Sequence, residues 1–178
     1  LLPLAQLESG QMTNSDSRVA VYTGSFDPIT LGHLNVIERS SRLVDRLIVG
    51  IGINIEKQSM FTREEREDQV RRCTKALKNV EVRSFSGLAV SFCRECGARV
   101  LLRGVRSLGD IESEFTMIMA NRKLDPGIET VLLMADGQYS HISSSLIKQI
   151  ASLASDEELS RFVPAEVVAD IRGKMAPG

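Results

Sequence analysis

Apolar residues recur along this chain with two different spacings. Short runs rich in Val, Ile and Leu are typical of strands buried on both faces, and longer segments carry apolar residues at helical intervals. The short runs predict five strands, at residues 18–22, 46–53, 80–85, 99–103 and 129–135. The helical spacing predicts helices at residues 31–44, 62–77, 87–96, 110–124, 143–154 and 165–175.

Local signals support several of these boundaries. Residues 62–65 and 155–158 have the pattern of capping boxes, and Asp125-Pro126-Gly127 is a stop signal for the helix before it. Because strand and helix alternate five times, we predict an α/β fold. It is a single Rossmann-like, doubly wound domain with a five-stranded parallel sheet and helices on both faces. Such sheets bind ligands beyond the carboxyl ends of their strands.

Length and charge restrict the class of protein. The 178 residues suit one domain, and a net charge of −1 gives no global attraction for nucleic acid or an anionic membrane. No apolar run approaches the roughly 20 residues that span a bilayer. We therefore expect a cytoplasmic protein with no nucleic-acid or membrane partner.

The first residues differ in character from the rest. Residues 1–17 lack the features of a secretory signal and are expected to be a disordered or non-native extension, with Met12 as a candidate start. We expect the folded domain to cover residues 18–178.

Metal and redox chemistry receive little support. Cys73, Cys93 and Cys96 are an odd number without a secretion signal, which favours a reducing compartment. The C-x-x-C pair, Cys93 and Cys96, lies in a helical stretch where i and i+3 share a face, without a second pair or a nearby histidine to complete a zinc set, so we expect ordinary helix positions. His33 and His141 are the only histidines, so no multi-histidine metal site is predicted.

The loop TGSFDPITLGH (23–33), after the first strand, is the most specific segment. Gly24 permits backbone torsions that other residues avoid, and Gly32 leaves room beside a helix N-terminus, whose N–H groups suit phosphate. Ser25 adds a hydroxyl, and His33 adds an imidazole N–H donor. The alternative is a plain turn with a surface histidine, but the whole string is more specific than that.

Two further loops carry basic residues. Arg103 and Arg106, three apart at the end of the fourth strand, can fork onto phosphate oxygens, with Gly104 allowing close approach. A solvated loop with surface ion pairs is the alternative. Lys57 lies in the loop after the second strand, and a single lysine in a loop is usually just solvated. Glu114 either accepts bonds from ribose hydroxyls or lies on an exposed helix face.

The segment YSHISSS (139–145) follows the fifth strand. Three serines at a helix start combine hydroxyls with unpaired N–H groups, whereas ordinary N-capping needs only one serine. The Walker loop, the third glycine of a dinucleotide fingerprint and the G-x-S-x-G elbow are all missing from the sequence. An anion site of another kind is therefore predicted.

Taken together, these segments resemble the bacterial phosphopantetheine adenylyltransferases from about Arg18 to Lys174. The resemblance rests on GSFDPITLGH, KQSMFTREER, LLRGVRSLGDIESE, MANRKL and ISSS, in the family's order and spacing. T-x-G-H at residues 30–33 is a version of the superfamily's H-x-G-H signature. The resemblance implies adenylyl transfer from ATP to 4′-phosphopantetheine, giving dephospho-coenzyme A and pyrophosphate.

The resemblance also implies a role for individual residues. His33, Lys57 and Arg106 would be catalytic, with His33 donating to the α-phosphate. The phosphopantetheine side would be held by Ser25, Lys57, Ala89 and Arg103. ATP would be contacted by Ser25, Phe26, His33, Gly104, Val105, Arg106, Glu114, Tyr139, Ser140, His141, Ile142, Ser143, Ser144 and Ser145.

Cofactor, assembly and mechanism follow from the same resemblance. Mg²⁺ would arrive with ATP rather than in a protein metal site, coenzyme A would be a feedback inhibitor, and the chain would form a homohexamer. The attacking phosphate is already an anion, so direct in-line attack needs orientation and positive charge but no general base or covalent intermediate.

Three alternatives remain open at this point. One is a nicotinamide-mononucleotide or cytidylyl transferase of the same superfamily. The others are a non-catalytic nucleotide-binding regulator and a subunit whose main role is assembly. Two departures from the family pattern, the stretch GINIE before Lys57 and the non-aromatic Ser113, affect the expected substrate affinity or feedback.

Overall fold

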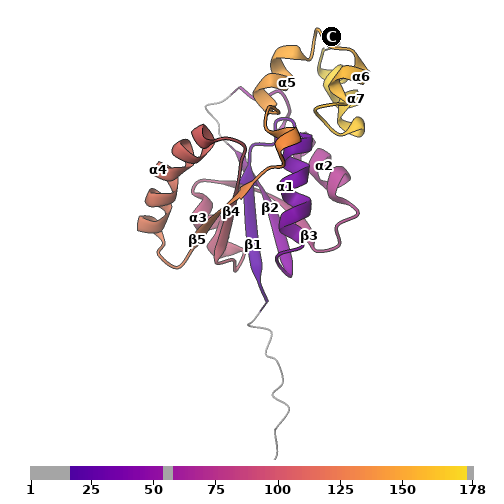
Figure 1. The fold of residues 1–178 in the computed structure, drawn as a ribbon. Coiled ribbons are helices and arrows are strands. Elements are labelled where there is room, and N and C mark those ends of the chain that lie inside the picture. Colours follow the sequence, from indigo (N-terminus) through magenta and orange to yellow (C-terminus); the bar gives the residue numbers. More distant parts are fainter. Residues whose placement is uncertain (1–16, 54–57, 176–178) are drawn as a thin grey trace, which may run out of the picture.

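The computed structural model describes residues 17–53 and 58–175, which form one parallel sheet with helices on both faces (Figure 1). The sheet has the strand order β3-β2-β1-β4-β5. The predicted α/β fold class is confirmed. The strands are β1 (Val19–Gly24), β2 (Arg46–Ile53), β3 (Val80–Ser86), β4 (Val100–Val105) and β5 (Glu129–Met134).

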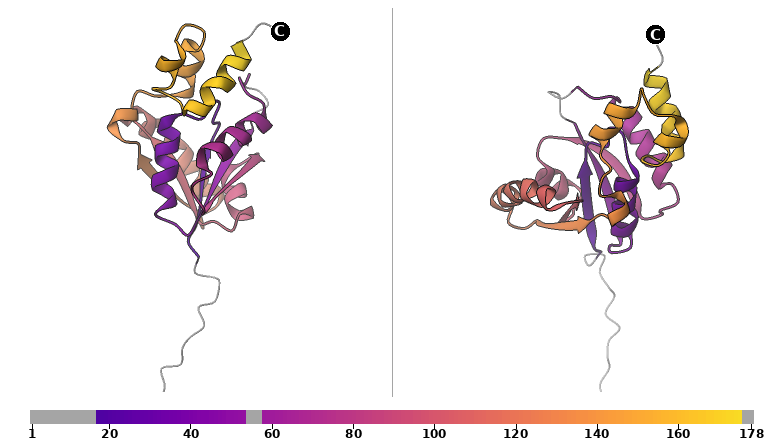
Figure 2. Two further views of the ribbon diagram at one scale, coloured as in Figure 1. Left: turned by 90° about the vertical axis from the view of Figure 1, so that its right-hand side faces the viewer. Right: turned by 45° about the horizontal axis from the view of Figure 1, so that its top comes forward.

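The helices follow the predicted alternation, and the last three lie together over the end of the sheet at which the strands finish (Figures 1 and 2). Among the described residues, no helix has the length and apolarity needed to cross a membrane. The helical elements are α1 (Leu31–Ser41), α2 (Arg63–Thr74), α3 (Ala89–Glu95), α4 (Leu108–Leu124), the 3₁₀ turn η1 (Gly137–Tyr139), α5 (Ser144–Ile150), α6 (Asp156–Leu159) and α7 (Ala165–Met175).

Three helices end several residues earlier than predicted. The helices expected over residues 31–44 and 62–77 end at Ser41 and Thr74, and the helix expected over residues 143–154 ends at Ile150. Arg172 of α7 donates to the carbonyl oxygen of Ala151 at 2.6 Å and also to that of Ala154. A long-range side chain thus satisfies carbonyls at the end of this segment, which a helix over 143–154 would leave without intrahelical partners, and no local sequence signal reveals this contact. The capping boxes of α2 and α6 both form as predicted.

The core is divided between the two faces of the sheet because side chains alternate along each strand. Ala20 and Tyr22 of β1 pack with residues of α1, α2 and α7, whereas Val21 packs with residues of α3. Cys93 and Cys96 lie in this second cluster, and burial raises the pKa of the Cys93 thiol to about 12. The C-x-x-C pair is therefore part of the core.

Gln69 provides a test of the packing of α2. Its side chain is 1% exposed, and neither amide atom has a hydrogen-bond partner within the described residues. Because an unpaired buried amide costs free energy, Gln69→Met should raise the free energy of unfolding by about 1 kcal/mol in urea titrations. Gln149→Met, at an exposed position of α5, is the control and should change it by less than about 0.5 kcal/mol. Destabilisation by Gln69→Met alone would show that the amide is satisfied.

Candidate active site

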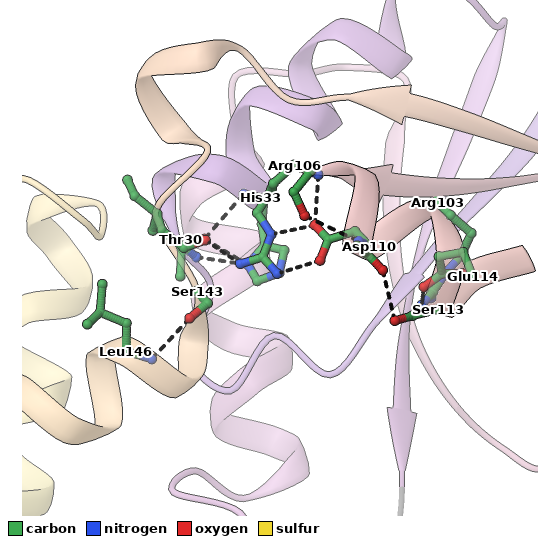
Figure 3. Close-up of polar contacts among 12 residues, drawn as sticks. Thr30, His33, Arg103, Arg106, Asp110, Ser113, Glu114, Ser143 and Leu146 are labelled. Atoms are coloured by element: carbon green, nitrogen blue, oxygen red, sulfur yellow. Dashed lines mark hydrogen bonds and ion pairs between the residues drawn. The ribbon is translucent and has the colours of Figure 1, made fainter.

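A pocket of about 320 Å³ opens beyond the carboxyl ends of β1 and β4. The chain adds β2 and β3 on one side of β1 and then β4 and β5 on the other. Doubly wound sheets usually bind ligands at this switch point. Figure 3 shows that its polar side chains come from the loop and first turn of α1, the end of β4, the start of α4 and the start of α5. Four segments distant in sequence therefore build one site.

His33 is fixed by the N-terminus of α1. Thr30 is the N-cap: its Oγ1 accepts from the His33 backbone N–H at 3.3 Å, while His33 Nδ1 accepts from the Thr30 backbone N–H at 3.1 Å (Figure 3). This is a capping box with histidine in place of the usual Glu or Gln. A backbone N–H can only donate, so Nδ1 is the acceptor and the proton of the neutral ring is on Nε2.

The surroundings of His33 keep its ring neutral. Burial, followed by the charges of Arg106 and Arg103, lowers the pKa of His33 from an ordinary value of 6.5 to about 4. Both the ring tautomer and its charge thus make His33 an N–H donor at neutral pH, the chemical property expected from the sequence. The tautomer has no signal in the sequence, because it depends on the bond to Thr30.

The backbone before α1 corrects one expectation. Gly24 is not among the described residues with positive φ, so the predicted need for unusual torsions is wrong. Instead, a Cβ on Gly24 would lie 2.9 Å from the ring of Phe26. Phe26 itself has φ 46°, a region that aromatic residues rarely adopt. Its ring is fully buried and packs edge-on against the ring of His33, with 5.1 Å between the two ring centroids.

Both arginines lie in the pocket wall, and each is paired with a carboxylate of α4 (Figure 3). Arg103 Nε and Nη2 donate to Glu114 at 2.8 and 2.7 Å. Arg106 Nε and Nη2 donate to Asp110 at 3.0 and 3.2 Å. The two arginines are three residues apart at the end of β4 and just after it. Their partner carboxylates are four residues apart in α4. Glu114 was expected from the sequence, and Asp110 was not.

The three serines before and within α5 have separate roles. Ser143 is the N-cap and accepts from the Leu146 N–H at 3.1 Å, which is the ordinary capping alternative (Figure 3). Ser144 Oγ donates to the carbonyl oxygen of Pro28 at 2.8 Å and joins α5 to the first loop. Ser145 lines the pocket and is exposed. Capping therefore accounts for one serine of the three.

A smaller hollow of about 260 Å³ adjoins Ser25 and contains charged residues that sequence reasoning missed. Asp27 accepts from the backbone N–H groups of Met60 and Phe61 at 3.0 and 2.9 Å and forms an ion pair with Lys148. The spacing of four residues between Ser144 and Lys148 in α5 was the available signal, because it places both on one face of the helix.

The structure brings together most of the predicted site. Ser25, His33, Arg103, Gly104, Arg106, Glu114, Ile142, Ser143, Ser144 and Ser145 line the main pocket. Lys57 lies outside the described residues. The predicted residues that do not line this pocket are Phe26 and Val105, which are buried, Ala89 at the start of α3, and Tyr139, Ser140 and His141 at the turn before α5.

Comparison with known proteins gives a consistent picture. The cytidylyltransferase-like family model matches residues 21–150. A phosphopantetheine adenylyltransferase from Rhodopirellula baltica is 54% identical over 170 residues, covering 95% of this chain and 93% of that protein. One from Clostridium botulinum is 47% identical over 154 residues, covering 86% of this chain and 96% of its own length.

A solved structure supports the fold at a greater distance. The Plasmodium falciparum nicotinic acid mononucleotide adenylyltransferase complexed with NaAD has a TM-score of 0.66 and 13% identity, covering 88% of this chain and 95% of the other. At that identity, the likeness concerns the arrangement of helices and strands.

The neutral state of His33 predicts a pH dependence of stability. Between pH 6.5 and about 4, the unfolded chain takes up a proton on His33 that the folded chain does not, so the free energy of unfolding falls as the pH falls. His33→Asn keeps an acceptor for the Thr30 N–H but removes this titration. When the pH is lowered from 6.5 to about 4, the free energy of unfolding of this variant should fall by about 1–2 kcal/mol less than that of the wild type. Urea titrations at the two pH values measure this difference.

The control for this experiment is His141→Asn, which removes an exposed imidazole. The same change in both variants would contradict a buried, neutral His33.

Proposed function

The chain belongs to the phosphopantetheine adenylyltransferases, and from its pocket we propose how it transfers an adenylyl group from ATP to 4′-phosphopantetheine, releasing dephospho-coenzyme A and pyrophosphate. The observation that carries this proposal is the convergence of one neutral N–H donor, His33 Nε2, with Arg103 and Arg106 in a single pocket. The relatives named phosphopantetheine adenylyltransferase match 95% and 86% of this chain, which favours this acceptor over nicotinamide mononucleotide.

The reaction requires in-line displacement at the α-phosphorus of ATP. An oxygen of the phosphopantetheine phosphate forms the new P–O bond, and the bond to pyrophosphate breaks. His33 Nε2–H donates to a non-bridging α-phosphate oxygen, and Arg106 adds positive charge where negative charge builds up. Because His33 accepts no proton in this scheme, its low pKa favours the reaction rather than opposing it.

The two substrates occupy different parts of the site in this proposal. The phosphopantetheine side comprises Ser25, Arg103 and Ala89, together with Lys57 outside the described residues. The nucleotide lies toward the N-terminus of α5, where free N–H groups and the hydroxyl of Ser145 suit phosphate oxygens. Coenzyme A, which shares the pantetheine arm, is the expected feedback inhibitor at the same pocket.

In this proposal Mg²⁺ arrives with ATP rather than in a protein site. Within the described residues, no group of three or more His, Cys, Asp or Glu side chains could hold a metal ion. The pocket carboxylates Asp110 and Glu114 are each bonded to an arginine. A magnesium ion that accompanies ATP would take its ligands from the phosphates and water, and no step above depends on it.

A cytoplasmic homohexamer is part of the proposal. The number six and the compartment come from the family resemblance, and exposed apolar side chains of α4 and β5 support association between copies. Phe115, Met117 and Met119 of α4 are 62, 57 and 53% exposed, and Val131 and Met134 of the edge strand β5 are 43 and 45% exposed. Figure 2 shows α4 standing at the side of the sheet next to β5. Apolar surface of this extent is typical of subunit contacts.

Assembly can be tested by charge insertion. Phe115→Glu should shift the chain from a hexamer to smaller species in light scattering, because a buried unpaired carboxylate disfavours the contact. Leu153→Glu is the control, since Leu153 is 85% exposed but lies after α5. A monomeric wild type at micromolar concentration, or equal dissociation of both variants, would reject this surface.

The decisive assay for function is pyrophosphate release from ATP and magnesium with three acceptors supplied separately. These are 4′-phosphopantetheine, nicotinamide mononucleotide and glycerol phosphate. We expect release with the first alone, and His33→Asn should lower kcat by about 100- to 1,000-fold, as for other lost transition-state donors. Release with another acceptor would overturn the substrate, and normal kcat in the variant would overturn the role of His33.

A further inference from the structure

We propose that Asp110 is a positioning residue for adenylyl transfer, and that its carboxylate orients the guanidinium of Arg106 toward the phosphates of the nucleotide. The inference rests on the proposed function for its kinetic part. It concerns a residue that touches the pocket but that the chemistry above leaves without a role.

Asp110 holds Arg106 at three points (Figure 3). The backbone N–H of Arg106 donates to Oδ2 at 2.8 Å, Nε donates to the same oxygen at 3.0 Å, and Nη2 donates to Oδ1 at 3.2 Å. A side-on bidentate contact fixes both the plane and the rotation of a guanidinium. The backbone of Asp110 is itself held in place, because its N–H donates to Oγ of the N-cap Ser107 at 3.2 Å.

The donors that remain on Arg106 form a matched pair. A guanidinium has five N–H groups. Asp110 takes one from Nε and one from Nη2, and the carbonyl oxygen of Ile142 accepts one from Nη1 at 2.7 Å. Within the described residues, this leaves one N–H on each terminal nitrogen. Two N–H groups on adjacent nitrogens match two oxygens of one phosphate.

The N–H groups of Arg103 are bonded in a different pattern. Its Nε and Nη2 donate to Glu114, and its Nη1 donates to both the carbonyl oxygen and the hydroxyl of Thr23, at 2.8 and 3.0 Å. In the described part of the chain, only one of its N–H groups is then uncommitted, on Nη2. Arg106 is thus the arginine of the pair that can bind a phosphate in a fork.

Charge and orientation make opposite predictions for Asp110, which makes the proposal testable. A carboxylate beside the pocket repels phosphate, so its removal should strengthen anion binding if charge alone mattered. If Asp110 acts by orienting Arg106, removal should weaken binding even though the pocket becomes more positive.

The first test is calorimetric binding of inorganic pyrophosphate to the full chain. Asp110→Asn should raise Kd by about fivefold or more, equivalent to losing part of one charge-assisted contact. Glu112→Gln is the matched control, because it removes the same charge from an exposed position of α4 and should leave Kd within about twofold. Equal or tighter pyrophosphate binding by Asp110→Asn would overturn the proposal.

The second test is a double-mutant cycle in the pyrophosphate-release assay. Asp110→Asn should lower kcat/KM for ATP by about tenfold, and Asp110→Glu should recover part of that loss. In an Arg106→Lys background, Asp110→Asn should cost less than about twofold, because lysine has no guanidinium plane to orient. Additive losses would show a structural role instead.

The two tests separate this proposal from the proposed function. Wild-type protein that does not turn over phosphopantetheine would reject the function, while pyrophosphate binding would still decide the role of Asp110.

Discussion

The pairing of each pocket arginine with a carboxylate of α4 is the interaction on which the site depends. A pocket for several phosphates needs concentrated positive charge, and that charge must remain stable when no ligand is bound. Glu114 and Asp110 meet this requirement at the cost of some attraction for the ligand. The same carboxylates connect the end of β4 to the first two turns of α4, so charge compensation and chain geometry come from the same bonds.

His33 contributes a hydrogen-bond donor to the pocket without carrying a charge that needs a counter-ion. Two nearby arginines and burial exclude a proton from the ring, and the bond from Thr30 selects the tautomer with Nε2 protonated. The ring therefore donates a hydrogen bond without adding a third positive charge. Phe26, with its positive φ, packs its ring edge-on against the imidazole. Strain in the backbone is thus located where orientation matters most.

The sequence predicts the fold and much of the site because both depend on local patterns. Strand β2 was predicted residue for residue at 46–53, and most pocket residues stand at the strand ends where parallel sheets bind ligands. What escaped prediction depends on side-chain geometry. Arg172 reaches the carbonyls after α5 from α7, and the tautomer of His33 depends on its bond to Thr30. Asp110 pairs with Arg106 only four residues away, a local spacing that could have indicated it. Gly24 was placed correctly, but for the wrong physical reason.

The exposed apolar residues of α4 and β5 bear on what happens to a newly made chain. Strand β5 is an edge strand of the described sheet, and Val131 and Met134 on it are exposed, although the Met134 carbonyl accepts from Arg39. Such an edge can pair with any extended segment that it meets. Rapid subunit association after synthesis would therefore compete directly with aggregation, and the solubility of the chain would depend on how quickly it finds its own copies.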